Sequence, residues 1–224
     1  MNLWPSIWIS LQLAALTTVI LTALALPLAW WLARTKSRLR PLIEALTALP
    51  LVLPPTVLGF YLLILMAPSA PLGAMFLRLT GDTLAFSFAG LVVASVLYSL
   101  PFAVQPLQNA FQAIGPGVME AAATLGAAPR DAFRSVALPL ARRGMITAAV
   151  LTFAHTLGEF GVVLMVGGNI PGRTRVISIE VFSAVETLDY RGAHILSAGL
   201  LVFSVLVLTV VYRMNQKGEA RRDD

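Results

Sequence analysis

The sequence predicts an all-α integral membrane protein with five transmembrane helices, an external N-terminus and a cytoplasmic C-terminus. Of its 224 residues, 58% are hydrophobic and only 12% are charged, which is too little charge to cover the outside of a soluble domain. The charges also leave gaps, each longer than the roughly 20 apolar residues with which a helix crosses a ~30 Å hydrocarbon layer. The apolar runs are continuous and do not alternate with polar residues as the strands of a membrane barrel do, which favours helices.

The first span, at about 8–31, lies in the stretch before Arg34, which contains no charged side chain. We expect the other spans at about 45–67, 84–107, 146–167 and 193–212. The opening residues lack the basic segment of a cleavable signal, so the first span is expected to remain. One membrane domain, residues 6–212, therefore occupies nearly the whole chain, followed by a tail at 213–224.

Lysine and arginine residues set the predicted orientation. Twelve of the 16 basic residues fall in three segments, namely the connection after the first span, the loop 108–145 and the tail 213–224. The positive-inside rule places these three segments in the cytoplasm. Five spans require termini on opposite sides, so the number of spans and the charges agree. The basic residues border the spans and do not gather on a soluble face, which argues against nucleic acid as a partner and leaves the lipid bilayer.

The second predicted span is interrupted by Pro50, Pro54 and Pro55. Each proline removes a backbone donor and crowds the carbonyl four residues earlier. A membrane helix tolerates this only where neighbouring groups or a wet cavity satisfy the freed backbone. Two interpretations stay open, a bent helix that lines a conduit and an ordinary packing kink.

The loop 108–145 contains the most informative stretch, residues 120–139. Helix-favouring alanines lead to Gly126, a residue type that ends helices. Pro129 suits the first turn of a second short helix, which is expected to end before Pro139. An apolar face on this second helix is predicted from Ala132, Phe133, Val136 and Ala137. Such a helix can lie on lipid or dock in a partner's groove.

The same stretch resembles the signature of bacterial ATP-binding-cassette (ABC) importer permeases of type I. The matching residues are Glu120, Ala121, Ala122, Gly126, Val136, Leu138 and Pro139. In that family the short helix couples the membrane domain to a separate ATPase. The resemblance implies two ATPase subunits, a second copy of this chain and an external substrate-binding protein. The chain has no phosphate-binding loop of its own, so ATP and Mg²⁺ would be bound by the ATPase, and this chain would be a transport subunit without cofactor or enzymatic site.

Two further stretches narrow the expected substrate. Gly158-Glu159-Phe160-Gly161 together with 168–175 is similar to permeases for tetrahedral oxyanions, and 49–59 is similar to their molybdate branch. The resemblance implies import of molybdate, and also tungstate, across a prokaryotic cytoplasmic membrane. A sulfate or thiosulfate permease is the near alternative. A membrane-embedded enzyme using His155 and Glu159, and an ion-driven transporter, are more distant ones; inverted repeats typical of the latter are not visible.

Candidate residues of the path or gate are Pro54, Pro55, Gly158, Glu159 and Gly161. Glu159 is an acid inside a span, where a carboxylate costs about 2.5–3.5 kcal/mol unless it is compensated. An acid repels a dianion, so a gating or supporting role is expected for it. His155 lies four residues earlier and is expected to form a hydrogen bond with Glu159.

In the outer connection, Asn169, Arg173 and Thr174 are candidates for contact with a binding protein or a passing anion. The alternative for Arg173 and Arg175 is an ordinary solvated pair of charges. Gln105 and Asn109 could line a polar path or form hydrogen bonds between helices. The chain has no cysteine, which excludes disulfides and thiolate chemistry.

Overall fold

The computed structural model describes residues 3–219, and every regular element in that part of the chain is helical, which confirms the predicted class. The elements in chain order are α1 (Trp4–Arg34), α2 (Arg40–Val52), α3 (Pro55–Met66), α4 (Pro71–Thr80), α5 (Phe88–Tyr98), α6 (Leu100–Gln112), α7 (Gly115–Thr124), α8 (Pro129–Ala132), a π-helical turn (Phe133–Ala137), α9 (Leu138–Gly158), α10 (Gly161–Gly167), α11 (Ile177–Glu186) and α12 (Tyr190–Glu219).

Five apolar segments are long enough to cross a membrane when each bent pair counts as one. Three are long helices: α1, the continuous run Pro129–Gly158 and the run Tyr190–Arg213 of α12. The other two are pairs, α2 with α3 and α5 with α6, which are bent by 110° and 41°. This arrangement agrees with the five predicted spans. The charges at 221 and 222, which belong to the predicted tail, lie outside the described residues.

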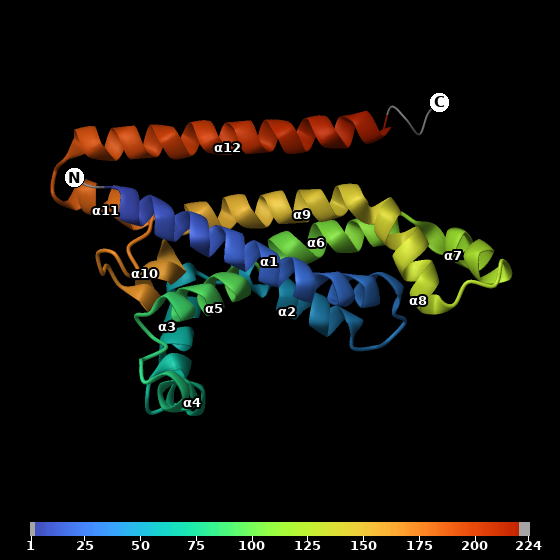
Figure 1. Ribbon diagram of the computed structural model, residues 1–224, viewed down its shortest axis with the longest axis horizontal. Coiled ribbons are helices and arrows are strands. Elements are labelled where there is room, and N and C mark those ends of the chain that lie inside the picture. Colours follow the sequence, from blue (N-terminus) through green and yellow to red (C-terminus); the bar gives the residue numbers. More distant parts are fainter. Residues whose placement is uncertain (1–2, 220–224) are drawn as a thin grey trace.

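The bundle has two distinct ends (Figure 1). The beginning of α1 and helix α11 lie at one end, and α7 and α8 lie at the other, which we call the loop end. The connection from α1 to α2 and the C-terminal part of α12 also lie at the loop end. The first two basic segments and the described part of the third thus lie at one end of the molecule, as the orientation prediction requires; which side of the membrane this end faces stays a prediction.

The core forms where α1, α6 and α9 pack together. Leu21, Leu32 and Phe111 are almost fully buried there, among several alanines. Small residues let the helices approach closely, as is typical of membrane bundles. A Cβ placed on Gly144 of α9 would lie 2.3 Å from the Cβ of Ala110 on α6. The α6–α9 contact therefore depends on this glycine.

Helix α12 lies apart from this core (Figure 1). It packs mainly against α11 and α9, and only 6% of its most apolar stretch is buried within the chain. Such exposure is what a lipid-facing span or a contact with another subunit requires. The fifth predicted span is thus present as a single helix.

The structure corrects three predicted boundaries. The second span is two helices separated by a sharp bend at Leu53–Pro54, because Pro54 and Pro55 together prevent continuation of the helix. The fourth span does not run to residue 167, since α9 ends at Gly158 and Glu159 is extended before α10 begins. The helix after Pro129 does not end before Pro139.

The reason for the last correction is the π-helical turn Phe133–Ala137. Leu138 N donates to Phe133 O, five residues earlier, so the backbone is wider at this point than in an α-helix. Pro139 stands at the start of α9, where its missing N–H costs little. The helix therefore continues through the proline from α8 into α9.

Candidate functional site

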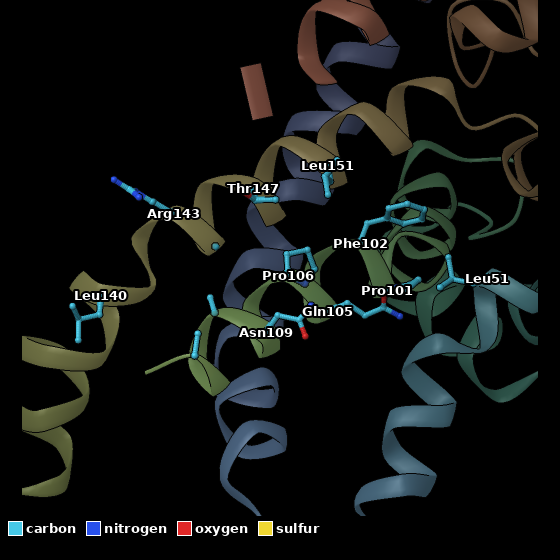
Figure 2. Close-up of a pocket in the computed structure, with 13 residues that line it drawn as sticks. Leu51, Pro101, Phe102, Gln105, Pro106, Asn109, Leu140, Arg143, Thr147 and Leu151 are labelled. Atoms are coloured by element: carbon cyan, nitrogen blue, oxygen red, sulfur yellow. The ribbon is translucent and has the colours of Figure 1, made fainter. Parts of the chain in front are cut away.

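A cavity of about 600 Å³ lies between α6 and α9, toward the loop end of the bundle (Figure 2). Its polar lining consists of Gln105 and Asn109 from α6 and Arg143 and Thr147 from α9, with no aspartate or glutamate among the lining residues. The apolar lining comes from Leu51, Pro101, Phe102, Pro106, Ala110, Ala113, Leu140, Gly144 and Leu151. The absence of acids from this lining suits an anion better than a cation. In Figure 2, Arg143 extends away from Gln105 and Asn109.

Gln105 and Asn109 lie one helical turn apart on the exposed face of α6. Neither side-chain amide forms a hydrogen bond within the described residues, whereas the neighbouring Gln108 donates to Glu44 of α2 at 2.6 Å. Of the two interpretations left open by the sequence, lining of a polar cavity fits Gln105 and Asn109, and interhelical bonding fits Gln108. Exposed, unbonded amides inside a span are unfavourable against lipid, so their place beside a cavity is physically consistent.

A second cavity, of about 330 Å³, lies farther from the loop end, where α3, α5, α9 and α10 meet. It brings together four of the five predicted path residues, Pro55, Gly158, Glu159 and Gly161. The fifth, Pro54, is the residue directly before α3. Tyr98, Ala154, His155 and Phe160 complete the lining. The structure therefore places the break of the second span and the break of the fourth span at one cavity.

Glu159 is only 5% exposed. Its Oε2 accepts a hydrogen bond of 3.3 Å from Ser95 Oγ on α5, while Oε1 has no hydrogen-bond partner among the described residues. Its backbone carbonyl accepts from Ser178 Oγ of α11 at 2.5 Å. One residue thus links the α9–α10 break to both α5 and α11, which is a supporting geometry.

The predicted hydrogen bond between His155 and Glu159 is wrong. Because α9 ends at Gly158, Glu159 leaves the helical register that would place it over His155. Instead, His155 Nδ1 lies 2.9 Å from Ser99 Oγ. The imidazole stacks on Phe102 at 3.9 Å between ring centroids and lies 5.2 Å from the ring of Tyr98.

In the connection between α10 and α11, Arg173 pairs with Asp82, and both side chains are about half exposed. The exposure of Arg173 fits its alternative interpretation as a solvated charge, but its pairing with Asp82 was not predicted. Arg175 behaves differently, since its guanidinium lies 3.7 Å from the buried carboxylate of Glu180 and its Nε donates to Asn169 Oδ1 at 2.5 Å. The two arginines therefore have different surroundings despite their proximity in sequence.

Thr174 is fully buried. Its hydroxyl donates to Gly167 O at 2.7 Å and accepts from Ile170 N at 3.3 Å, which fastens the connection onto the end of α10. Asn169 donates to Ser183 of α11. Among the predicted outer residues, Arg173 and Asn169 remain accessible, and Thr174 supports the loop from inside.

The loop-end segment contains one short helix, α7, followed after a break by α8, which continues into α9 and is not the separate short helix that the sequence predicted. Helix α7 ends at Thr124, and Gly126 has a φ of +85°, a conformation that glycine adopts without strain. Pro129 is the first residue of α8. Glu120, Ala121 and Gly126 are exposed, and Leu125 is 88% exposed. This exposed surface contains three of the seven matched signature residues.

The apolar face predicted from Ala132, Phe133, Val136 and Ala137 exists, and it is turned toward the chain's own bundle. Ala132 and Ala137 are buried. The centroid of the Phe133 ring lies 4.9 Å from that of Trp30 on α1 and 6.1 Å from that of Phe111 on α6. Neither lipid nor a partner groove takes up this face. Leu125, Gly126, Arg130 and Arg134, by contrast, are exposed.

Sequence reasoning did not single out Ser95, Ser99, Tyr98 or Phe102. Ser95 and Ser99 are completely buried and bind Glu159 and His155, respectively. The sequence feature that could have identified Ser95 and Ser99 is their spacing, because two small polar residues four positions apart in an apolar run lie on one face of a helix. Such a polar face indicates hydrogen-bond partners on a neighbouring helix. Among the described residues, no group of His, Asp and Glu side chains gathers as a metal ion would need.

Comparison with known proteins is consistent with this geometry. Residues 25–222 match the family described as binding-protein-dependent transport system inner membrane component. The molybdenum transport system permease protein ModB of Azotobacter vinelandii is 59% identical over 92% of either chain, and that of Escherichia coli K12 is 32% identical over 97% of either chain. A bacterial alginate ABC transporter, solved in complex with a periplasmic protein carrying an alginate pentasaccharide, has a TM-score of 0.68 over 96% of this chain and 78% of its own, at 17% identity. The chain therefore belongs to the family of binding-protein-dependent transport system inner membrane components.

Proposed function

We propose that this inner-membrane component is the permease subunit of an ABC importer that carries molybdate, and also tungstate, into the cell. The observation that carries the choice of substrate is the 59% identity to the molybdenum permease of Azotobacter vinelandii over nearly the whole chain. The cavity lining between α6 and α9, which contains Arg143 and no acid, is compatible with an anionic substrate.

The energy for transport is proposed to come from a separate ATPase, present in two copies, that binds ATP and Mg²⁺ and docks on the exposed surface around Gly126. The contacts of the loop support a mechanical connection. Phe133, in the π-helical turn that follows α8, packs against Trp30 of α1 and Phe111 of α6, so a displacement of this turn bears directly on two helices of the core. Because α6 also lines the larger cavity, closure of two ATPases would alter the shape of that cavity. This chain itself would hold no cofactor and catalyse no covalent step.

A second copy of the chain is part of the proposal. The larger cavity is bordered by α2, α6 and α9, and large apolar side chains of α3 and α12 are exposed. A homodimer would cover apolar surface of this kind and close a path between the two copies. An external molybdate-binding protein would dock at the opposite end from α7 and α8, where Asn169 and Arg173 are accessible.

The deciding experiment is reconstitution in vesicles of this chain with an ATPase subunit and a molybdate-binding protein, followed by measurement of radiolabelled molybdate uptake. We expect uptake that requires ATP, the ATPase and the loaded binding protein, and that persists when sulfate is present at the same concentration as molybdate. Inhibition by equal sulfate would favour a sulfate-type permease. Failure to associate with the ATPase, or uptake that is independent of ATP, would refute the proposal.

A further inference from the structure

One aromatic contact joins the linings of the two cavities. Phe102 lines the larger cavity, His155 lines the smaller one, and their rings stack at 3.9 Å with an angle of 23° between the planes. Tyr98 lies beside the same imidazole and also lines the smaller cavity. A direct passage between the two cavities along α6 and α9 would run past this His155–Phe102 stack.

Hydrogen bonds fix the orientation of the His155 ring. Its Nδ1 lies 2.9 Å from Ser99 Oγ, and that oxygen lies 3.0 Å from Thr156 Oγ1. Within the described residues Nε2 has no hydrogen-bond partner. Stacking on Phe102 holds the plane of the ring, and the bond to Ser99 holds its rotation, so Nε2 is the nitrogen that remains for a ligand.

The lining of the smaller cavity leaves few groups that can receive an oxyanion. Glu159 is an acceptor and repels an anion, and the remaining lining is apolar except for Tyr98 and His155. A transport path needs contacts that are favourable enough for entry and weak enough for release. Single hydrogen-bond donors such as the Tyr98 hydroxyl and an imidazole N–H meet this requirement better than a cluster of arginines.

We infer that His155 contacts the oxyanion in transit through its Nε2–H group and that Ser99 is its positioning residue. This inference rests on the proposed function, because it assigns a contact on the path of the same anion. The required tautomer carries its imidazole proton on Nε2 and accepts a hydrogen bond at Nδ1. The two hydroxyl groups permit this arrangement, in which Thr156 donates to Ser99 Oγ and Ser99 donates to Nδ1.

The test uses the complete complex with its ATPase and binding protein, with molybdate as the probe. A glutamine at 155 places its amide nitrogen where Nε2 lies, an asparagine reaches only the position of Nδ1, and a phenylalanine keeps the stack without any donor. We expect His155→Phe and His155→Asn to slow uptake about tenfold, the effect of losing one hydrogen bond to a charged group. His155→Gln is expected to retain most of the uptake.

Ser99 is tested by a double-mutant cycle. Ser99→Ala is expected to slow uptake severalfold when His155 is present and to have no further effect when residue 155 is glutamine, because the glutamine has no Nδ1 to position. A structural role for Ser99 would instead give the same loss in both backgrounds, which would overturn its assignment as a positioning residue.

Two controls keep the outcome specific. His194, which is exposed near the start of α12, is replaced by asparagine and is expected to leave uptake unchanged. ATP hydrolysis stimulated by the loaded binding protein is measured for every variant and is expected to persist when uptake falls. Equal uptake by the Gln, Asn and Phe variants would overturn the role of His155 while leaving the proposed function intact; absence of uptake by the unsubstituted complex would instead refute the proposed function.

Discussion

Gly161 lies directly against Pro55, so that a Cβ placed on Gly161 would be 2.6 Å from the Cβ of the proline ring. These two residues stand at the beginnings of α10 and α3, immediately after the breaks in the fourth and second spans. The neighbouring turn repeats the arrangement, since a Cβ on Gly59 would lie 2.7 Å from the Cβ of Met165. The two breaks are therefore packed against each other through glycines.

This contact predicts that Gly161→Ala destabilises the protein. The added methyl group meets a proline ring that cannot rotate away, so α3 or α10 must shift, at a cost of about 1–3 kcal/mol in the free energy of unfolding. Thermal unfolding in detergent measures the effect. The matched control is Gly199→Ala on α12, where a Cβ would meet nothing within 4 Å, and no destabilisation is expected there. Equal stability of the two variants would contradict the close contact.

Gly126→Trp is expected to abolish transport while the protein still inserts into the membrane. No atom lies within 4 Å of a Cβ at this position, so the bundle itself accepts the side chain, apart from the backbone strain of a positive φ, about 1–3 kcal/mol. The bulk would occupy the space proposed for the ATPase. Co-purification of the ATPase and molybdate uptake are measured together, and both are expected to fall.

Gly81→Trp separates backbone strain from loss of the partner surface. Gly81 has a φ of +73° and, like Gly126, no atom within 4 Å of a Cβ, but it follows α4, far from the loop end (Figure 1). Co-purification of the ATPase is expected to remain normal in this variant. Loss of the ATPase in both variants would attribute the effect to strain, whereas normal uptake with Gly126→Trp would remove the coupling role of this residue.

Arg173 and Arg175 are expected to respond differently to replacement by alanine. Arg173→Ala breaks an exposed pair with Asp82 and should change the free energy of unfolding by less than about 1 kcal/mol. Arg175→Ala leaves the buried carboxylate of Glu180, among the described residues, with the hydrogen bond from Ser6 alone, and should cost about 2 kcal/mol or more. Chemical unfolding in detergent compares the two variants.

The Glu180→Gln substitution checks the cause of this difference. If the cost of Arg175→Ala comes from an unpaired buried charge, then Glu180→Gln in the same chain should recover part of the lost stability, because the neutral amide is cheaper to bury. A double variant no more stable than Arg175→Ala alone would show that Arg175 acts through its bond to Asn169 instead.

Ser95→Ala tests the carboxyl group at the α9–α10 break. Ser95 donates to Glu159 across the bundle, so its removal leaves a buried carboxyl without a described side-chain donor, at a cost of about 1–3 kcal/mol. Thermal unfolding in detergent measures the loss. Ser204→Ala is the control, because Ser204 donates only to the carbonyl of Leu200 in its own helix; a loss there as large as for Ser95 would contradict the interpretation.

Features of the chain that depend on local chemistry could be predicted from the sequence. The apolar spans follow from uninterrupted runs of apolar residues, because lipid requires each backbone group to be bonded within its own helix. The apolar face at Ala132, Phe133, Val136 and Ala137 follows from the helical period alone. The break after α7 at Gly126 follows from the one residue type that adopts a positive φ without strain.

Only the tertiary structure decided where the broken spans lie and what their polar residues contact. Prolines at 54 and 55 predict an interruption, but the sequence does not show that the 110° bend packs against Gly161, more than a hundred positions away. The same holds for His155, whose register predicted Glu159 as partner and whose actual partner is Ser99 on another helix. Helical spacing determines which residues share a face, whereas packing between helices determines what that face meets, because those contacts join segments that the sequence does not place together.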